Sequence, residues 1–204
     1  MLQDKVIKIA VVTHDVKLAN AVVEEAARRG FAAFHVVDPA QVPLSVKAAV
    51  VKMSEGIGAG HATPVFAEDY SSTVAAVDRA MEITLGRSIV ERAVVAVDPG
   101  KKVGAAFIAD NILLRTESYT DFTVFAEAVN NFFQNHPRSR HVVLMGSGAP
   151  EFREQLAAKI LEKNPSLRPE NIITVSEENT SKHAKGADEL AASFLLRKSR
   201  SPRG

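Results

Sequence analysis

The sequence predicts an α/β protein built from two parts: an N-terminal parallel layer of Rossmann-like type and a C-terminal domain with a mixed sheet. In residues 1–90, short apolar runs alternate with segments whose apolar residues recur at helical spacing, which is typical of a parallel sheet with helices. After residue 90 a second strand-first pattern begins. Here two β-rich runs are separated only by Asp110 and Asn111, which predicts a tight antiparallel hairpin. We therefore expect domains at residues 1–90 and 91–198, followed by a basic tail over residues 199–204 that we expect to be disordered.

Composition narrows the classes of function that the chain can have. Of its 204 residues, 46% are hydrophobic and 24% are charged, which is ordinary for a globular protein with a core. The chain contains no cysteine, so disulfides, zinc–thiolate sites and thiol catalysis are excluded. No apolar run approaches the ~18 residues of a membrane span, and residues 1–20 carry no signal-peptide pattern. We therefore expect a soluble cytoplasmic protein with no membrane partner.

The N-terminal elements follow from the apolar runs, which predict strands at residues 5–12, 31–37, 46–53 and 64–67. Asp15 is placed to cap a helix that runs through Arg29, while His14 beside it is expected on the surface. A second helix is predicted over residues 71–85, before Gly86. The glycine-rich residues 56–60 do not match the dinucleotide-binding fingerprint, because no helix follows them directly. We expect a mobile loop there, with His61 as an ordinary loop histidine.

The C-terminal elements begin with the apolar run Val94 to Val97, which predicts a strand buried on both faces. It leads into Asp98, a proline and Gly100, a glycine that permits a sharp turn. The hairpin strands are expected at 104–109 and 112–119, and a helix capped by Thr120 or Asp121 follows them. Its aromatic stripe faces the core and consists of Phe122, Phe125, Val129, Phe132 and Phe133. The remaining elements are a strand at 141–145, a helix with Pro150 in its first turn, a strand at 171–175, and a final helix carrying Leu190, Phe194 and Leu195.

Three acids stand at related positions in this layout. Asp98 ends one strand, Glu177 follows the last strand, and Asp188 opens the final helix. The carboxyl ends of strands in an open α/β sheet face one crevice, and three carboxylates there would repel unless cations compensated them. Two divalent metal ions about 4 Å apart would resolve that repulsion and activate water for attack on a phosphodiester. Spacing alone equally allows a surface Glu177 and an Asp188 that complements the helix dipole.

Three motifs carry a resemblance to a known family. The first motif looks like the pattern Asp-x-Gly-x-Lys/Arg-x-Gly-x-Ala and is Asp98-Pro99-Gly100-Lys101-Lys102-Val103-Gly104-Ala105-Ala106. The second is similar to an Asp-Glu-Arg-x-Thr-Ser/Thr segment and is Glu177-Glu178-Asn179-Thr180-Ser181. The third resembles an Asp-x-x-Ala-Ala helix opening and is Asp188-Glu189-Leu190-Ala191-Ala192. With these motifs in order, residues 93–197 resemble the RNase H-like superfamily, in particular its RuvC-like and YqgF-like Holliday junction resolvases. The sequence has Gly146-Ser147-Gly148 where RuvC proper has an acid, which favours the YqgF-like arrangement. Ser176 and Glu178 replace the usual Asp and Arg.

The resemblance implies a metal-dependent, structure-selective nuclease. It implies that Asp98, Glu177 and Asp188 hold Mg²⁺ or Mn²⁺ and catalyse phosphodiester hydrolysis in branched DNA or structured RNA. The residues expected to contact phosphates are Lys101, Lys102, Lys182 and Lys185. A homodimer is left open.

Two other functions remain open at this point. One is a nucleotide-binding relative of the actin and sugar-kinase group, whose phosphate loops would be Asp98-Pro99-Gly100 and Gly146-Ser147-Gly148. The other is a non-catalytic RNase H-like protein that binds a partner.

Overall fold

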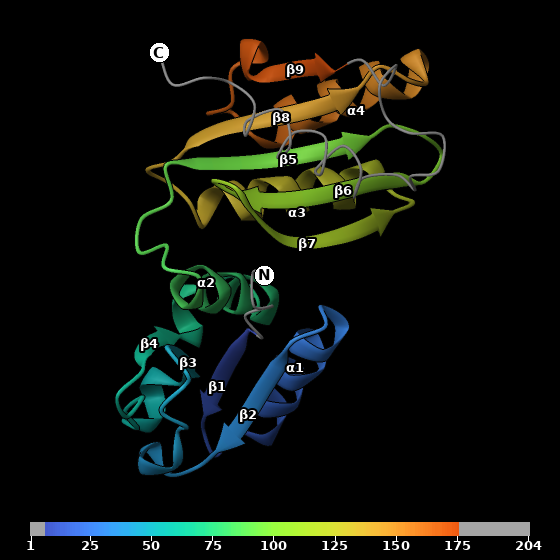
Figure 1. Cartoon of the computed structure of the whole chain (residues 1–204). Helices are drawn as coiled ribbons and strands as arrows, with labels where there is room; N and C mark the ends of the chain where they lie inside the picture. The colour runs from blue at the N-terminus through green and yellow to red at the C-terminus, as the bar shows by residue number, and fades with distance from the viewer. Residues whose placement is uncertain (1–6, 176–204) are drawn as a thin grey trace, which may run out of the picture. The chain divides into compact units, whose positions relative to one another are not determined.

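The protein is α/β, with a four-stranded parallel sheet and a five-stranded mixed sheet, as the sequence predicts. The computed structural model describes residues 7–175 and divides the chain into two compact units, unit 1 up to Ile89 and unit 2 from Val90 (Figure 1). The elements of unit 1 are β1 (Lys8–Val12), α1 (Val16–Arg28), β2 (Ala32–Val36), η1 (Pro39–Gln41), β3 (Ala48–Val51), η2 (Met53–Glu55), β4 (Thr63–Phe66), η3 (Ala67–Asp69) and α2 (Thr73–Thr84).

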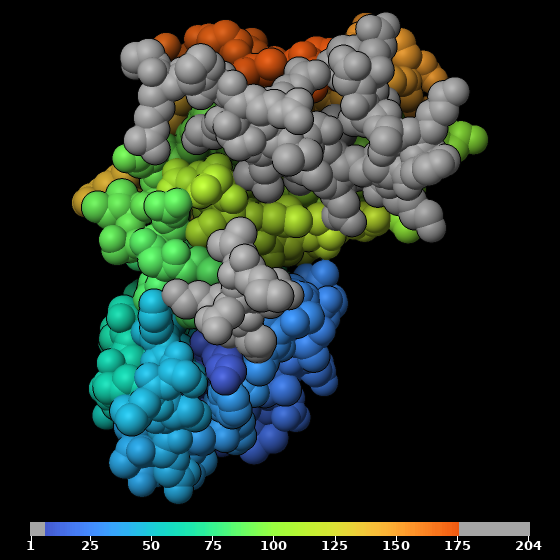
Figure 2. Space-filling view, viewed as in Figure 1, coloured from blue at the N-terminus to red at the C-terminus, as the bar shows by residue number. Residues whose placement is uncertain are grey.

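The sheet of unit 1 has the order β2-β1-β3-β4, with all neighbours parallel. Helices cover one of its faces: α1 packs on β1 and β2, and α2 packs on β1, β3, β4 and α1. Loop residues cover the other face, where Val42, Val46, Ala59 and Ala62 pack against small side chains of β1 and β3. Because both faces are covered, β1 and β3 are almost continuously apolar and buried, as parallel strands usually are. In the space-filling view the described atoms of this unit form a closely packed surface on the side turned toward the viewer (Figure 2).

A buried ion-pair network joins the two helices of unit 1. The guanidinium of Arg29, at the C-terminal end of α1, contacts the Asp78 carboxylate of α2 at 2.6 Å and the Glu25 carboxylate at 2.5 Å. It also donates to the Val74 carbonyl at 3.2 Å. The side chains of Arg29 and Asp78 are only 4% and 5% exposed, so replacing Arg29 would leave the buried Asp78 carboxylate without this cation.

The segment around residues 56–60 is a loop, as predicted, but its turns are specific. Gly56 ends η2 in the left-handed conformation, with φ of 64°. Gly60 also has a positive φ, and a Cβ there would lie 2.5 Å from the Pro39 carbonyl oxygen, so only glycine fits. His61 Nε2 lies 3.1 Å from the Val46 carbonyl and ties the loop to the segment before β3. This contact anchors the end of the loop to its neighbour.

Unit 2 consists of β5 (Arg92–Asp98), β6 (Val103–Ala109), β7 (Ile112–Tyr119), α3 (Phe122–Gln134), β8 (Arg140–Gly146), α4 (Pro150–Lys163), η4 (Pro169–Asn171) and β9 (Ile172–Val175). Its sheet has the order β7-β6-β5-β8-β9, in which β6 is antiparallel to β5 and β7, whereas β8 and β9 run parallel to β5. The predicted hairpin is confirmed: Ala109 pairs with Ile112, and Asp110 has a φ of 54°.

The aromatic stripe on α3 forms part of the core of unit 2, as its helical spacing predicts. Phe125, Phe132 and Phe133 are buried, and Phe132 meets Phe107 of β6 edge to face at 5.3 Å between ring centroids. Phe122, in the first turn, is only half-buried and contacts Phe152 of α4 instead. Figure 1 shows α3 and α4 on the same face of the sheet, and the two helices pack against each other.

The predicted final helix and basic tail lie outside the described residues, as do the first six residues. Among the described helices, none is long and apolar enough to cross a membrane.

Candidate functional site

Asp98 is the last residue of β5, the central strand of unit 2. Residues 93–97 of that strand are fully buried, whereas Asp98 is half-buried. Asp98 pairs with Gly104 of β6, and the residue before it, Val97, pairs with Met145 of β8. The carboxylate is therefore held by a rigid central strand at the carboxyl end of the parallel part of the sheet, where open α/β sheets place ligands.

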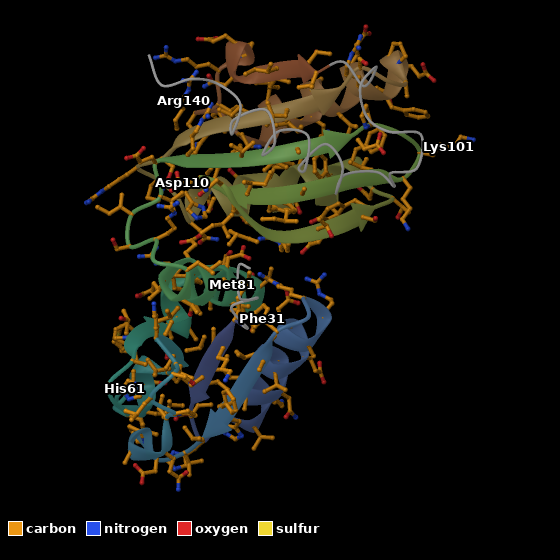
Figure 3. The ribbon with its side chains drawn as sticks, viewed as in Figure 1. Phe31, His61, Met81, Lys101, Asp110 and Arg140 are labelled. Atoms are coloured by element: carbon orange, nitrogen blue, oxygen red, sulfur yellow. The ribbon has the colours of Figure 1, made fainter. Side chains whose placement is uncertain are left out.

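The turn after Asp98 exposes two lysines. Lys101 and Lys102 are both exposed, and Figure 3 shows the Lys101 side chain at the outer end of the sheet. Gly100, which the sequence analysis assigned to a sharp turn, does not have a positive φ, and a Cβ there would meet only the Lys102 carbonyl at 3.5 Å. The turn that the sequence predicts after Asp98 is present, since β6 runs back antiparallel to β5, but its backbone does not require a glycine at this position.

The loop after β8 reaches the same edge. The Ser147 amide donates to the Val175 carbonyl at 3.0 Å, which joins the ends of β8 and β9. Ala149 has a φ of 40°, and Pro150 then starts α4 at its first position, as predicted. The Arg153 guanidinium donates to the Ser147 carbonyl at 3.2 Å and brings a cation to this loop. Arg153 is not among the residues that the sequence motifs indicate, although its place in the first turn of the helix after this loop is a signal.

Glu177 and Asp188 lie outside the described residues, and so do Lys182 and Lys185. The described part of β9 ends at Val175, which pairs with Gly146. Val175 therefore ends its strand at the same edge of the sheet as Asp98. Of the predicted site, the structure thus positions Asp98, Lys101 and Lys102.

At this edge the described residues 7–175 supply the Asp98 carboxylate together with nearby cations. Within that range no group of three or more histidine and carboxylate side chains is arranged to hold a metal ion. Asp98 alone supplies one oxygen-donor ligand of the kind that Mg²⁺ and Mn²⁺ take. A metal centre here would need further ligands from the chain after Val175.

The carboxyl edge of the sheet in unit 1 is also polar. After β1, the Thr13 hydroxyl donates to Glu55 Oε1 at 2.6 Å, and the His14 amide donates to Glu55 Oε2 at 2.9 Å. Asp15 caps α1 by accepting from two amides of its first turn, as predicted. It also forms an ion pair of 2.7 Å with Lys52, which follows β3. His14 is exposed, as predicted.

These contacts keep the acids of this edge ionised. The Lys52 ammonium lowers the pKa of Asp15, and the Thr13 hydroxyl lowers the pKa of Glu55. The Met53 amide, at 3.0 Å, lowers the pKa of the Glu68 carboxylate after β4. Since these acids bind groups of the chain itself, their presence at this edge is explained by a structural role. They cap a helix and connect the ends of neighbouring strands.

Comparisons with protein-family models, with curated proteins and with solved structures gave no match for this chain.

Proposed function

We propose that the protein is a metal-dependent nuclease that hydrolyses phosphodiesters in branched DNA or structured RNA at the edge of unit 2 that carries Asp98. The observation that carries the proposal is the placement of Asp98 at the carboxyl end of the buried central strand, at the edge where β9 ends two residues before Glu177 in the sequence. The element order of unit 2 and its mixed sheet also agree with what the RNase H-like resemblance implies.

The dimensions of the sheet are compatible with a centre of two metal ions. β8 lies between β5 and β9, so the two outer strands are about 10 Å apart at the usual spacing. Two metal ions about 4 Å apart, with carboxylates on either side, would span that gap and stabilise the attacking and leaving oxygens of the phosphodiester. In this proposal Asp98, Glu177 and Asp188 are the ligands.

Cations beside Asp98 would hold the substrate. Lys101 and Lys102 are exposed in the turn after β5, and Arg153 lies against the loop after β8. Phosphate contacts from such side chains attract nucleic acid of any sequence, with an affinity that falls as salt is added. The remaining phosphate ligands of the proposal are Lys182 and Lys185.

The test is a calorimetric titration of the full-length chain with Mn²⁺. We expect uptake at millimolar metal or below, and Asp98→Asn should abolish it while leaving the circular dichroism spectrum unchanged. Glu154→Gln removes an exposed carboxylate from the middle of α4 and is the matched control, which should bind Mn²⁺ like the wild type. Absence of uptake by the wild type, or equal uptake by Asp98→Asn, would contradict the proposal.

A further inference from the structure

A pocket of about 500 Å³ lies at the edge of unit 2 opposite Asp98. It is formed where α3 ends, where β8 begins and where the chain turns from α4 into β9. Figure 3 shows Arg140 at this end of the sheet, far from Lys101. Arg140 and Gly146 are the two ends of β8, so the pocket is about 20 Å from the candidate metal edge along the strand. It is therefore separate from the site of the proposed function.

Hydrogen bonds hold the walls of this pocket in place. His136 Nδ1 lies 2.8 Å from the Phe132 carbonyl, and His141 Nε2 lies 2.8 Å from the His136 carbonyl, so each of these nitrogens carries a proton and donates. The His141 ring stacks on Phe133 at 4.4 Å with an angle of 6° between the planes. Two residues before Ser166 of the pocket, Asn164 is buried, and its side-chain amide closes the end of α4 by donating to the Ile160 carbonyl at 2.7 Å. The pocket is thus pre-formed, which lowers the entropic cost of binding a ligand.

The side chains that line the pocket restrict the chemistry of its ligand. Five of its nine lining residues carry amide or hydroxyl groups: Asn130, Gln134, Ser139, Ser166 and Asn171. None of the nine is acidic, which disfavours a metal ion or an organic cation. Phe133, Pro137 and His141 add apolar surface beside these polar groups. Amides that both donate and accept match the mixed donor and acceptor edge of a nucleobase.

Arg140 adds the only full positive charge among the lining residues of the pocket. Its backbone amide donates to the Glu91 carbonyl at 2.8 Å and fixes the start of β8. Its guanidinium is exposed and has no hydrogen bond or ion pair within the part of the chain that the structure describes. Glu170, an acid close in sequence to the pocket wall, is paired with Arg168 at 3.8 Å. The Arg140 guanidinium is therefore available for a phosphate, which it can bind through two parallel hydrogen bonds.

We propose that this pocket binds a nucleoside monophosphate, with the amide groups contacting the base and Arg140 contacting the phosphate. A pocket of this volume belongs to the size class of small-ligand sites. The ligand is either a free nucleotide or one nucleotide of a nucleic acid strand, since both present the same base and phosphate. The site requires no metal ion and does not depend on the proposed nuclease activity.

The experiment is a calorimetric titration of the full-length chain in EDTA with AMP, GMP, CMP and UMP, followed by the matching nucleoside. At least one nucleotide should bind. Arg140→Gln should weaken its binding at least about tenfold, the usual effect of losing hydrogen bonds to a charged group, while leaving nucleoside binding unchanged. The double variant Asn130→Ala and Gln134→Ala should weaken both ligands about fivefold or more. If a short single-stranded oligonucleotide displaces the nucleotide, the ligand is one nucleotide of a nucleic acid strand. If it does not, the ligand is a free nucleotide.

Arg138→Gln is the matched control, because Arg138 is an exposed arginine two residues away that does not line the pocket. It should leave nucleotide binding unchanged. The proposal is overturned if no nucleotide binds at millimolar concentration, if Arg138→Gln weakens binding as much as Arg140→Gln, or if inorganic phosphate binds as tightly as the nucleotide. Because the buffer contains EDTA, these outcomes do not depend on whether a metal ion binds at Asp98.

Discussion

At the carboxyl edge of the sheet in unit 1, Asp15 pairs with Lys52 and Thr13 with Glu55, whereas in unit 2 two exposed lysines follow Asp98. Both edges are built in the same way, with polar residues directly after buried parallel strands. In unit 1 the charges meet on neighbouring strand ends and hold the loops together. In unit 2 the two lysines that follow Asp98 are exposed at the end of the central strand. An acid that follows a buried strand thus has a structural role in unit 1, where a neighbouring strand end supplies its partner.

The largest effect is expected on the rate of nucleic acid cleavage, where a variant of Asp98 in unit 2 is compared with a variant of Asp15 in unit 1. With a branched DNA or structured RNA substrate and Mg²⁺ or Mn²⁺, Asp98→Asn should lower the cleavage rate at least about a hundredfold, because a charged metal ligand is lost. Asp15→Asn should leave the rate within about twofold of the wild type, since Asp15 is engaged within unit 1. Both are measured at one protein concentration, with EDTA as the blank. Equal losses in the two variants would remove the distinction between the edges.

For thermal stability we expect the opposite order, with a larger effect at Asp15 than at Asp98. Asp15→Ala removes the side chain that caps α1 and the partner of Lys52, so the melting temperature of unit 1 should fall by about 5 °C. Asp98→Asn should change it by less than about 2 °C, because the strand that holds it remains fully paired. Differential scanning calorimetry gives both values. If Asp98→Asn is the more destabilising variant, Asp98 has the structural role.

The smallest effect is expected on the stability of the folded protein at acid pH. The pKa values of Asp15, Glu55 and Glu68 are lowered in the folded protein, chiefly by Lys52, Thr13 and the Met53 amide, respectively. A lowered carboxyl pKa adds stability above the unfolded value of about 4, and this stability is lost as the pH falls through the folded value. Urea unfolding between pH 7 and about pH 3 should therefore show midpoints that decline below about pH 4.

Glu55→Gln sharpens this test, because the variant has already lost one of the charges. Its midpoint should decline less steeply with falling pH than that of the wild type. Glu154→Gln, the exposed control on α4, should follow the wild-type curve. Parallel curves for Glu55→Gln and the wild type would show that the ties at this edge of unit 1 do not depend on charge.

The class of the fold could be predicted from the sequence, because backbone preferences and hydrophobic periodicity act locally. The apolar run before Asp98 could only be a buried strand, and Asp110-Asn111 suited a left-handed turn that closes a hairpin. The caps at Asp15 and Asp121 were readable for the same reason, since a cap contacts amides two and three residues away.

Only the tertiary structure decided which distant side chains meet. The pairing of Asp15 with Lys52 depends on β1 and β3 being neighbours although β2 lies between them in the sequence. The pocket beside Arg140 likewise joins the end of α3 to the turn before β9. No local pattern encodes such contacts, because strand order and helix packing arise from burial summed over the whole unit. For the same reason Asp98 was found from its strand, whereas the surroundings of Arg140 were not.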